Sequence, residues 1–114
     1  MAGDHRAVPY LIEALKDKED SVRIKAIDVL AYFRRTEVLD ELVKYVTDKN
    51  KDIRNMTLQS LSYYQSPGAV KAVTLALADT EQDVRINAIK TLVKLDAKQA
   101  VSDVLALLKD PDDK

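Results

Sequence analysis

Apolar residues recur along the chain at two nested spacings. Within short stretches they lie three or four residues apart, as Leu11 and Leu15 do, which is the spacing of one face of an α-helix. Over longer distances the whole pattern returns, because arginines that each follow a valine or isoleucine stand 31 residues apart at Arg23, Arg54 and Arg85. A fixed period of this length is typical of stacked helical repeats, in which no unit can bury its apolar stripe alone.

Each repeat is predicted to hold a shorter first helix, an acidic turn and a longer second helix. Acidic residues such as Asp20 and Asp52 begin the second helices, where they complement the helix dipole. Pro9 lies in the first turn of the opening helix, and the run Ser66-Pro67-Gly68 is the clearest break between helices. The pattern predicts seven helices, the first ending near residue 17 and the others spanning about 19–34, 37–47, 50–64, 69–78, 81–95 and 98–109.

These helices make residues 1–114 one domain of about three and a half repeats. The predicted repeats are 7–37, 38–68 and 69–99, followed by the half repeat 100–114. Two explanations of the half repeat are open. We favour a segment of a longer array, because array ends need polar capping faces, and the alternative is that the last helix is itself the cap. Leu107 on that helix predicts a monomer or weak end-to-end self-association through the last helix.

Charged residues at two positions recur with the same period of 31 residues as the apolar pattern. We call the residues at one equivalent position of successive repeats a column. The two charged columns are Asp17, Asp48 and Asp79, and Arg23, Arg54 and Arg85. We expect a structural ladder and not repeated catalysis, because arginines at one helical position can meet acceptors in their own or the adjacent repeat through charge-assisted hydrogen bonds. Asp52 and Asp83, which precede arginines by two residues, are alternative acceptors to the aspartate column.

The first repeat also carries a family resemblance. Its runs Ala7-Val8-Pro9-Tyr10-Leu11-Ile12, Leu15-Lys16-Asp17 and Val22-Arg23-Ile24-Lys25-Ala26 resemble the short HEAT-like repeats named after phycobilisome (PBS) lyases. The resemblance extends over essentially the whole chain. It implies an all-α fold, a right-handed α-solenoid of stacked antiparallel helix pairs, with the exposed sides of the second helices lining a concave face. It does not define an activity, because such a scaffold serves many functions.

Composition excludes several classes of function. With 18 basic and 19 acidic residues the net charge is −1, which argues against a dedicated nucleic-acid binder. The chain has no cysteine, two glycines and one histidine, His5, so it offers no disulfide, no Gly-rich phosphate loop and no histidine cluster for metal. No apolar run reaches the roughly 18 residues of a membrane span. We therefore expect a non-enzymatic protein of the cytoplasm, with no cofactor, metal, nucleic-acid or membrane partner.

Residues that vary between repeats lie on the second helices, opposite the apolar stripe. They combine apolar groups, two tyrosines and a basic end, and tyrosine and methionine are common at recognition surfaces. We call these residues the second-helix strip: Ile24, Lys25, Asp28, Tyr32, Asn55, Met56, Gln59, Tyr63, Ile86, Asn87, Lys90 and Lys94. An equally open interpretation is that Ile24 and Ile86 pack between repeats and the others are ordinary surface.

Three functions of different classes follow from these observations. The leading one is a module that holds a protein or peptide partner on the strip, with Tyr32 and Tyr63 as anchors and Lys90 and Lys94 meeting acidic groups. The alternative, implied by the family name, is a fragment or subunit of a bilin lyase or another chromophore-handling protein. A nucleic-acid enzyme of the HEAT-like glycosylase type is disfavoured by the neutral charge and the absence of tryptophan.

Overall fold

The computed structural model describes residues 5–95, and the regular elements in this range are all helical. The α-helices are α1 (Val8–Ala14), α2 (Asp20–Leu30), α3 (Thr36–Leu42), α4 (Lys51–Leu61), α5 (Pro67–Leu75) and α6 (Gln82–Lys94). Three short 3-10 helices accompany them: η1 (His5–Ala7), η2 (Val43–Thr47) and η3 (Ala76–Ala78). The all-helical expectation is confirmed over this range, whereas the seventh helix and the half repeat 100–114 lie outside the described residues.

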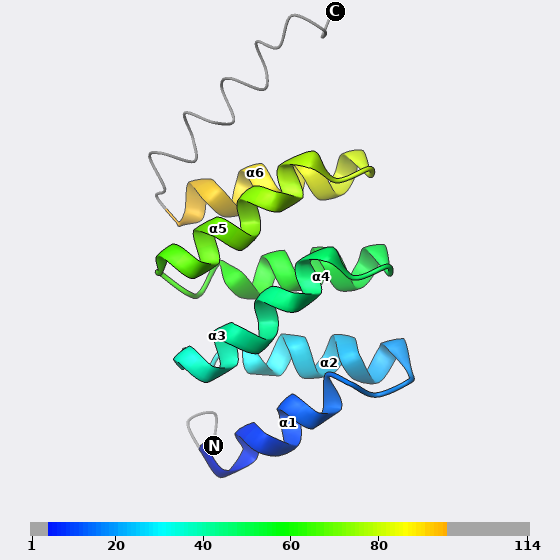
Figure 1. Ribbon diagram of the computed structural model, residues 1–114, viewed down its shortest axis with the longest axis vertical. Helices are drawn as coiled ribbons and strands as arrows, with labels where there is room; N and C mark the ends of the chain where they lie inside the picture. The colour runs from blue at the N-terminus through cyan, green and yellow to red at the C-terminus, as the bar shows by residue number, and fades with distance from the viewer. Residues whose placement is uncertain (1–4, 96–114) are drawn as a thin grey trace, which may run out of the picture.

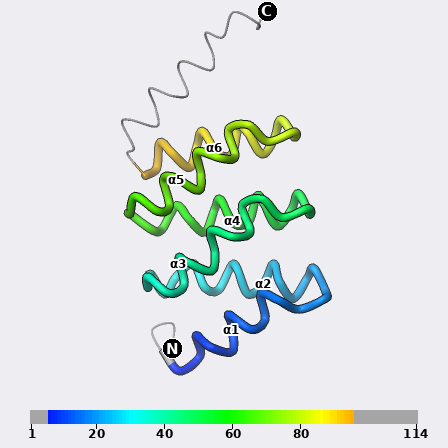
Figure 2. The backbone as a smooth tube through the Cα atoms, viewed as in Figure 1, coloured from blue at the N-terminus to red at the C-terminus, as the bar shows by residue number. Residues whose placement is uncertain are grey.

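The helices form three consecutive pairs, α1 with α2, α3 with α4, and α5 with α6. Figure 1 shows the pairs one above another in chain order. The longer, even-numbered helices contact one another in sequence, α2 with α4 and α4 with α6, and α3 contacts both α1 and α5. The backbone tube shows the same order, with α4 packed between its two neighbours (Figure 2). Each pair thus corresponds to one period of the sequence.

The apolar columns of the sequence supply the core between these helices. The column formed by Leu30, Leu61 and Leu92 is fully buried. The column that precedes the arginines is uneven, because Ile53 and Val84 are fully buried whereas Val22 is 38% exposed. Val22 belongs to the first pair, and no earlier pair lies among the described residues to cover it. Burial at this position therefore follows contact with a preceding pair, as expected for units that stack.

Two buried hydroxyl groups fasten the second pair to the first. The Ser60 hydroxyl donates to the carbonyl oxygen of Ile27 at 3.0 Å, and the Tyr64 hydroxyl donates to that of Leu30 at 2.9 Å. Tyr64 is only 5% exposed, as is Leu95, which stands 31 residues later at the same position of the next repeat. Through the described range, 5–95, no buried side-chain nitrogen or oxygen lacks a hydrogen-bond partner. The carbonyl oxygens of Ile27 and Leu30, near the end of α2, thus each accept a side-chain hydroxyl of the next repeat in addition to a backbone amide of their own.

Helix ends differ in detail from the sequence-based ranges. The first helices were expected to stay α-helical to residues 17, 47 and 78, but α1 ends at Ala14, and α3 and α5 continue as the 3-10 helices η2 and η3. The tighter turn lets amides bond carbonyls three residues back, as Asp48 does with Tyr45 and Asp79 does with Ala76, both at 3.2 Å. A final 3-10 turn satisfies carbonyl groups that an α-helix would leave unpaired before the chain turns.

Candidate functional site

The turn inside each helix pair is organised by an aspartate of the predicted ladder. The carboxylates of Asp17, Asp48 and Asp79 each accept a hydrogen bond from the backbone amide two residues later, at 2.8, 2.9 and 2.9 Å. This is an Asx turn, in which a side chain mimics the backbone and reverses the chain direction. The aspartate thus ends the first helix and places the start of the second.

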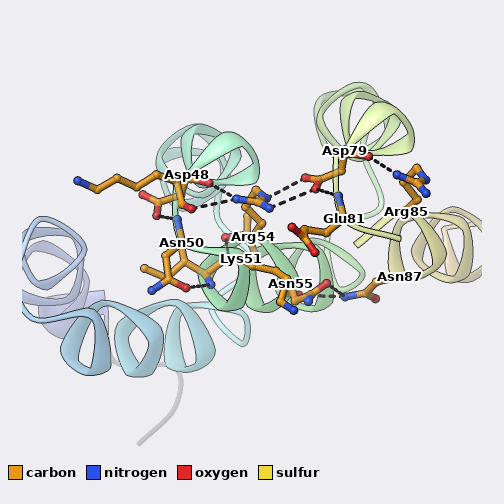
Figure 3. Close-up of polar contacts among 12 residues, drawn as sticks. Asp48, Asn50, Lys51, Arg54, Asn55, Asp79, Glu81, Arg85 and Asn87 are labelled. Carbon is orange, nitrogen blue, oxygen red and sulfur yellow. Dashed lines mark hydrogen bonds and ion pairs between the residues drawn. The ribbon is translucent and has the colours of Figure 1, made fainter. Parts of the chain in front are cut away.

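Arg54 joins two such turns. Its Nε and Nη2 donate to Oδ2 and Oδ1 of Asp79 at 2.8 and 3.2 Å, and its Nη1 donates to the carbonyl oxygen of Asp48 at 2.8 Å (Figure 3). The Arg54 and Asp79 side chains are 12% and 8% exposed, so this two-pronged ion pair is largely shielded from water. Arg54 therefore links its own turn to the turn of the next repeat.

The neighbouring arginines repeat parts of this geometry. Arg23 Nη1 donates to Asp48 Oδ1 at 2.9 Å, and the 25 residues between the partners equal the separation of Arg54 from Asp79. Arg85 Nη1 donates to the carbonyl oxygen of Asp79 at 2.6 Å, as Arg54 does to that of Asp48 (Figure 3). Of the two acceptor positions that the sequence left open, these arginines contact the aspartate column, and Asp83 instead pairs with Lys51 at 3.4 Å.

Asp20 adds a second connection at the first interface between pairs. Its carboxylate accepts hydrogen bonds from Arg23 Nη2 at 2.5 Å and from Asn50 Nδ2 at 2.6 Å. Hydrogen bonding to Arg23, and then to Asn50, lowers the pKa of Asp20 below its ordinary value. The same contact with Asp20, followed by that with Asp48, raises the pKa of Arg23. These charges hold each other in their ionised forms, which is what a structural ladder requires and a proton-transfer site does not.

The second-helix strip has solvent access along its whole length. Its exposed members are Lys25, Tyr32, Gln59, Tyr63, Ile86, Lys90 and Lys94, and its half-buried members are Ile24, Asp28, Asn55, Met56 and Asn87. The half-buried apolar members, Ile24 and Met56, pack against the core, whereas Ile86 is 45% exposed. The interpretation that apolar members pack between helices therefore fits Ile24 and not Ile86.

Contacts across the helices connect parts of the strip. The rings of Tyr32 and Tyr63 lie 5.4 Å apart at a tilt of 47°, and both side chains are exposed. The nearby Tyr63, and then the charge of Asp28, raise the pKa of the Tyr32 hydroxyl. Farther along, Asn87 Nδ2 donates to the backbone and side-chain oxygens of Asn55 at 3.2 and 3.0 Å (Figure 3). Neighbouring repeats thus bring predicted strip residues into direct contact.

Sequence reasoning missed a pocket at the edge of the stack. Its volume is about 490 Å³, and it is lined by residues 34–35 and 62–66 of two loops that join successive pairs, together with Thr36 and Leu39 of α3. Arg34 within it has a φ of 54°, the left-handed region that favours glycine. The pocket follows no repeating column, so the period could not reveal it. The one available signal was the doublet Arg34-Arg35, whose counterpart one period later is Gln65-Ser66.

Between residues 5 and 95, histidine, cysteine, aspartate and glutamate side chains do not gather in groups of three or more that could hold a metal ion. In the same range, the helices are too short or too polar to cross a membrane.

Comparison with known proteins identifies the repeat. No curated protein matches the chain. A family model described as HEAT repeats matches residues 8–83, which extend from α1 into the start of α6 and make up more than half of the chain. HEAT repeats commonly mediate protein–protein interaction, and the family is generally a non-enzymatic scaffold. The paired helices and this match together establish that the chain belongs to the HEAT repeat family.

Proposed function

We propose that this protein is a non-enzymatic interaction module that holds a protein segment along the second-helix strip. The observation that carries the proposal is the ring pair of Tyr32 and Tyr63, which are 55% and 38% exposed although they touch each other. Aromatic side chains offer large contact areas with a polar tip and are frequent anchors of protein interfaces. A scaffold that needed these positions only for packing would bury the rings, as it buries Tyr64.

The rest of the strip suggests the character of the partner. Ile86, on α6, adds an exposed apolar group, and the exposed Lys90 and Lys94 lie farther along the same helix. A partner segment with apolar side chains facing the tyrosines and acidic residues facing the lysines would complement this order. We further propose that the stacked pairs continue as a right-handed α-solenoid over residues 1–114 and present the strip as its concave face.

An affinity experiment with matched variants tests the proposal. The wild-type chain and a Tyr32→Ala/Tyr63→Ala/Lys90→Glu variant would be immobilised and exposed to lysate of the source organism, and retained proteins identified by mass spectrometry. Tyr10→Ala is the control, because Tyr10 is 80% exposed but lies on α1, a first helix. We expect a partner retained by wild type and control and lost by the strip variant, whose fold circular dichroism would verify. A partner retained equally by all three chains would contradict the assignment to the strip.

A second candidate is the chromophore-handling role implied by the PBS-lyase branch of the family. It rests on the resemblance of the first repeat, Ala7 to Ala26, to those proteins. If it applies, mixing the protein with a linear tetrapyrrole should shift and intensify the visible absorbance band. An unchanged spectrum at high protein concentration would remove this candidate and leave the interaction module.

A further inference from the structure

We propose that the pocket between the loops after α2 and α4 binds a single anionic group of a partner peptide, held by Arg34 and Arg35. The site lies at the edge of the stack and is separate from the second-helix strip, with which it shares only Tyr63. It therefore adds a binding site that the proposed function neither contains nor requires.

The charge in this pocket is positive and partly unneutralised. The residues that line it include Arg34 and Arg35 and no aspartate or glutamate. Glu37 approaches from α3 and accepts a hydrogen bond from Arg35 Nη2 at 2.7 Å, so the charge of Arg35 is partly satisfied. Within residues 5–95, the Arg34 side chain forms no hydrogen bond or ion pair. An incoming anion would thus find one uncommitted guanidinium and a second one beside it.

The remaining walls favour an anion carried on an apolar stem. Leu39, Tyr63 and Tyr64 supply apolar surface, and the hydroxyl groups of Thr36 and Ser66 lie at the same pocket. The Tyr64 hydroxyl is committed to the carbonyl oxygen of Leu30, which leaves its ring as part of the wall. A volume of about 490 Å³ accommodates one large side chain with its charged end, and not an extended polymer.

Neither arginine is needed by the fold at its position. Arg34 has a positive φ of 54°, which strains any side chain with a Cβ atom and suits glycine. Arg35 is the N-cap residue of α3 but makes no side-chain cap, whereas its counterpart Ser66 caps α5 by accepting from the amide of Ala69. Strained or suboptimal residues that persist on a surface are frequently kept for function.

A carboxylate and a phosphate could both supply the anion, and a peptide is the favoured carrier. The chain has a net charge of −1, so it carries no overall excess of positive charge to attract nucleic acid. Glutamate and phosphotyrosine both place an anion at the end of an apolar stem. The shared chemistry is therefore one oxyanion on a peptide side chain, and the experiment distinguishes its two sources.

Nuclear magnetic resonance titration of the ¹⁵N-labelled full chain tests the proposal. The probes are four capped peptides that differ at one central residue: phosphotyrosine, tyrosine, glutamate and glutamine. We expect phosphotyrosine, glutamate or both to shift the Arg34 and Arg35 side-chain signals and the amide signals of Gln65 and Ser66. The uncharged counterparts should leave these signals unmoved. The responding charged probe identifies phosphate or carboxylate as the source.

A double variant removes the charge while respecting the fold. In Arg34→Gly/Arg35→Ser, glycine suits the positive φ and serine supplies the missing cap, so the melting temperature should not fall. Affinity for the charged probe should fall roughly tenfold to a hundredfold, as expected when a charge-assisted contact is lost. Lys18→Ala is the matched control, because it removes one exposed positive charge from the turn between α1 and α2.

Several results would overturn the proposal. These are the absence of any response to the charged peptides, equal responses to charged and uncharged peptides, or unchanged affinity in the double variant. Tighter binding of a single-stranded oligonucleotide at the same arginines would show a polyanion site instead. Because Tyr32→Ala and Lys90→Glu leave the two arginines intact, a chain carrying these changes should still respond, which separates this site from the strip.

Discussion

At the scale of single residues, the surroundings decide what an ion pair contributes. The side chains of Arg54 and Asp79 are nearly shielded from water and form two parallel hydrogen bonds. The pair of Arg35 and Glu37 is as short, at 2.7 Å, but its side chains are 38% and 54% exposed. Exposed pairs contribute little because water and salt screen them, whereas a shielded pair that loses one partner leaves a poorly solvated charge behind.

Arg54→Ala should therefore lower the free energy of unfolding by roughly 2–4 kcal/mol, because the shielded Asp79 carboxylate loses both hydrogen bonds from Arg54 and keeps only the one from the Glu81 amide. Arg35→Ala, the matched control, should change it by less than about 1 kcal/mol. Chemical denaturation of the two variants beside wild type measures the difference. Indistinguishable unfolding curves for Arg54→Ala and wild type would refute the structural role of the ladder.

Asp20 predicts a dependence of stability on pH. Its pKa is lowered in the folded state by Arg23 and Asn50, so the folded protein binds this proton less readily than the unfolded chain. The stabilisation is thus present above the ordinary aspartate value of 3.8 and is lost as the pH falls through the lower folded value. Asp20→Asn should be less stable than wild type at neutral pH, and the difference should shrink in acid. A constant difference from pH 7 to pH 2 in thermal melts would contradict this.

At the scale of elements, the two described loops between pairs start the next helix in different ways. Ser66 caps α5 and Pro67 begins it, so this junction follows ordinary helix-start chemistry. The preceding junction uses Arg34 at positive φ and an uncapped Arg35. Two junctions of the same architecture thus differ in how well their residues suit the backbone.

This difference predicts opposite effects of two substitutions at Arg34. Valine, which is branched at Cβ, should lower the free energy of unfolding by about 1–2 kcal/mol, because β-branched residues are rarely tolerated at positive φ. Glycine should be tolerated or slightly stabilising. Thermal denaturation of Arg34→Val and Arg34→Gly makes the comparison. If valine and glycine proved equally stable, residue 34 would not hold this backbone conformation in solution.

The number and approximate bounds of the described helices could be predicted from the sequence. The six described α-helices fall within the predicted ranges to within a few residues, because the period of 31 and the helical spacing act on every repeat. The 3-10 endings of the first helices were missed, since they depend on where carbonyl groups find partners and not on apolar spacing. The arginine partners stayed ambiguous, because an aspartate precedes every arginine by six residues and a second one precedes Arg54 and Arg85 by two. Only stacking brings the next repeat's Asp79 to Arg54.

The candidate sites were also predictable only in part from the sequence. Exposure of Tyr32 and Tyr63 was expected because they lie opposite the apolar stripe of the second helices, but their mutual contact depends on the distance between neighbouring helices, which the sequence does not give. The pocket at Arg34 gave no periodic signal, since it depends on a positive φ that the doublet Arg34-Arg35 does not predict. Periodic features are thus readable from sequence, whereas features unique to one junction need coordinates.

At the scale of the whole molecule, stability should be distributed by position in the stack. Leu30 and Leu61 occupy one column and are both fully buried, but α2 belongs to the first pair whereas α4 packs between α2 and α6. In stacked repeats, stability is approximately a sum over units and their nearest-neighbour interfaces. A destabilising substitution in α4 therefore weakens two interfaces between pairs at once, whereas one in α2 weakens a single described interface.

Leu61→Ala and Leu30→Ala should each cost about 2–5 kcal/mol, as buried leucine truncations do. Their spatial effects should differ. Native-state hydrogen exchange should speed up in all three pairs for Leu61→Ala, and mainly in α1 and α2 for Leu30→Ala. Identical exchange patterns in the two variants would mean that the described pairs unfold as one indivisible unit.

The distance in sequence from each arginine to its carboxylate has a consequence for how such a gene can change. Arg23 and Arg54 reach aspartates 25 residues downstream, so one residue inserted into a helix between the partners would shift the arginine and the aspartate out of register. An insertion in the loop between pairs could instead be absorbed at the surface. Copying a full period of 31 residues would instead bring a new arginine and a new aspartate already in phase. Lineages of this protein should therefore gain or lose whole copies, with small insertions confined to the loops between pairs, so that the ladder acts as a ruler for the evolution of its own length.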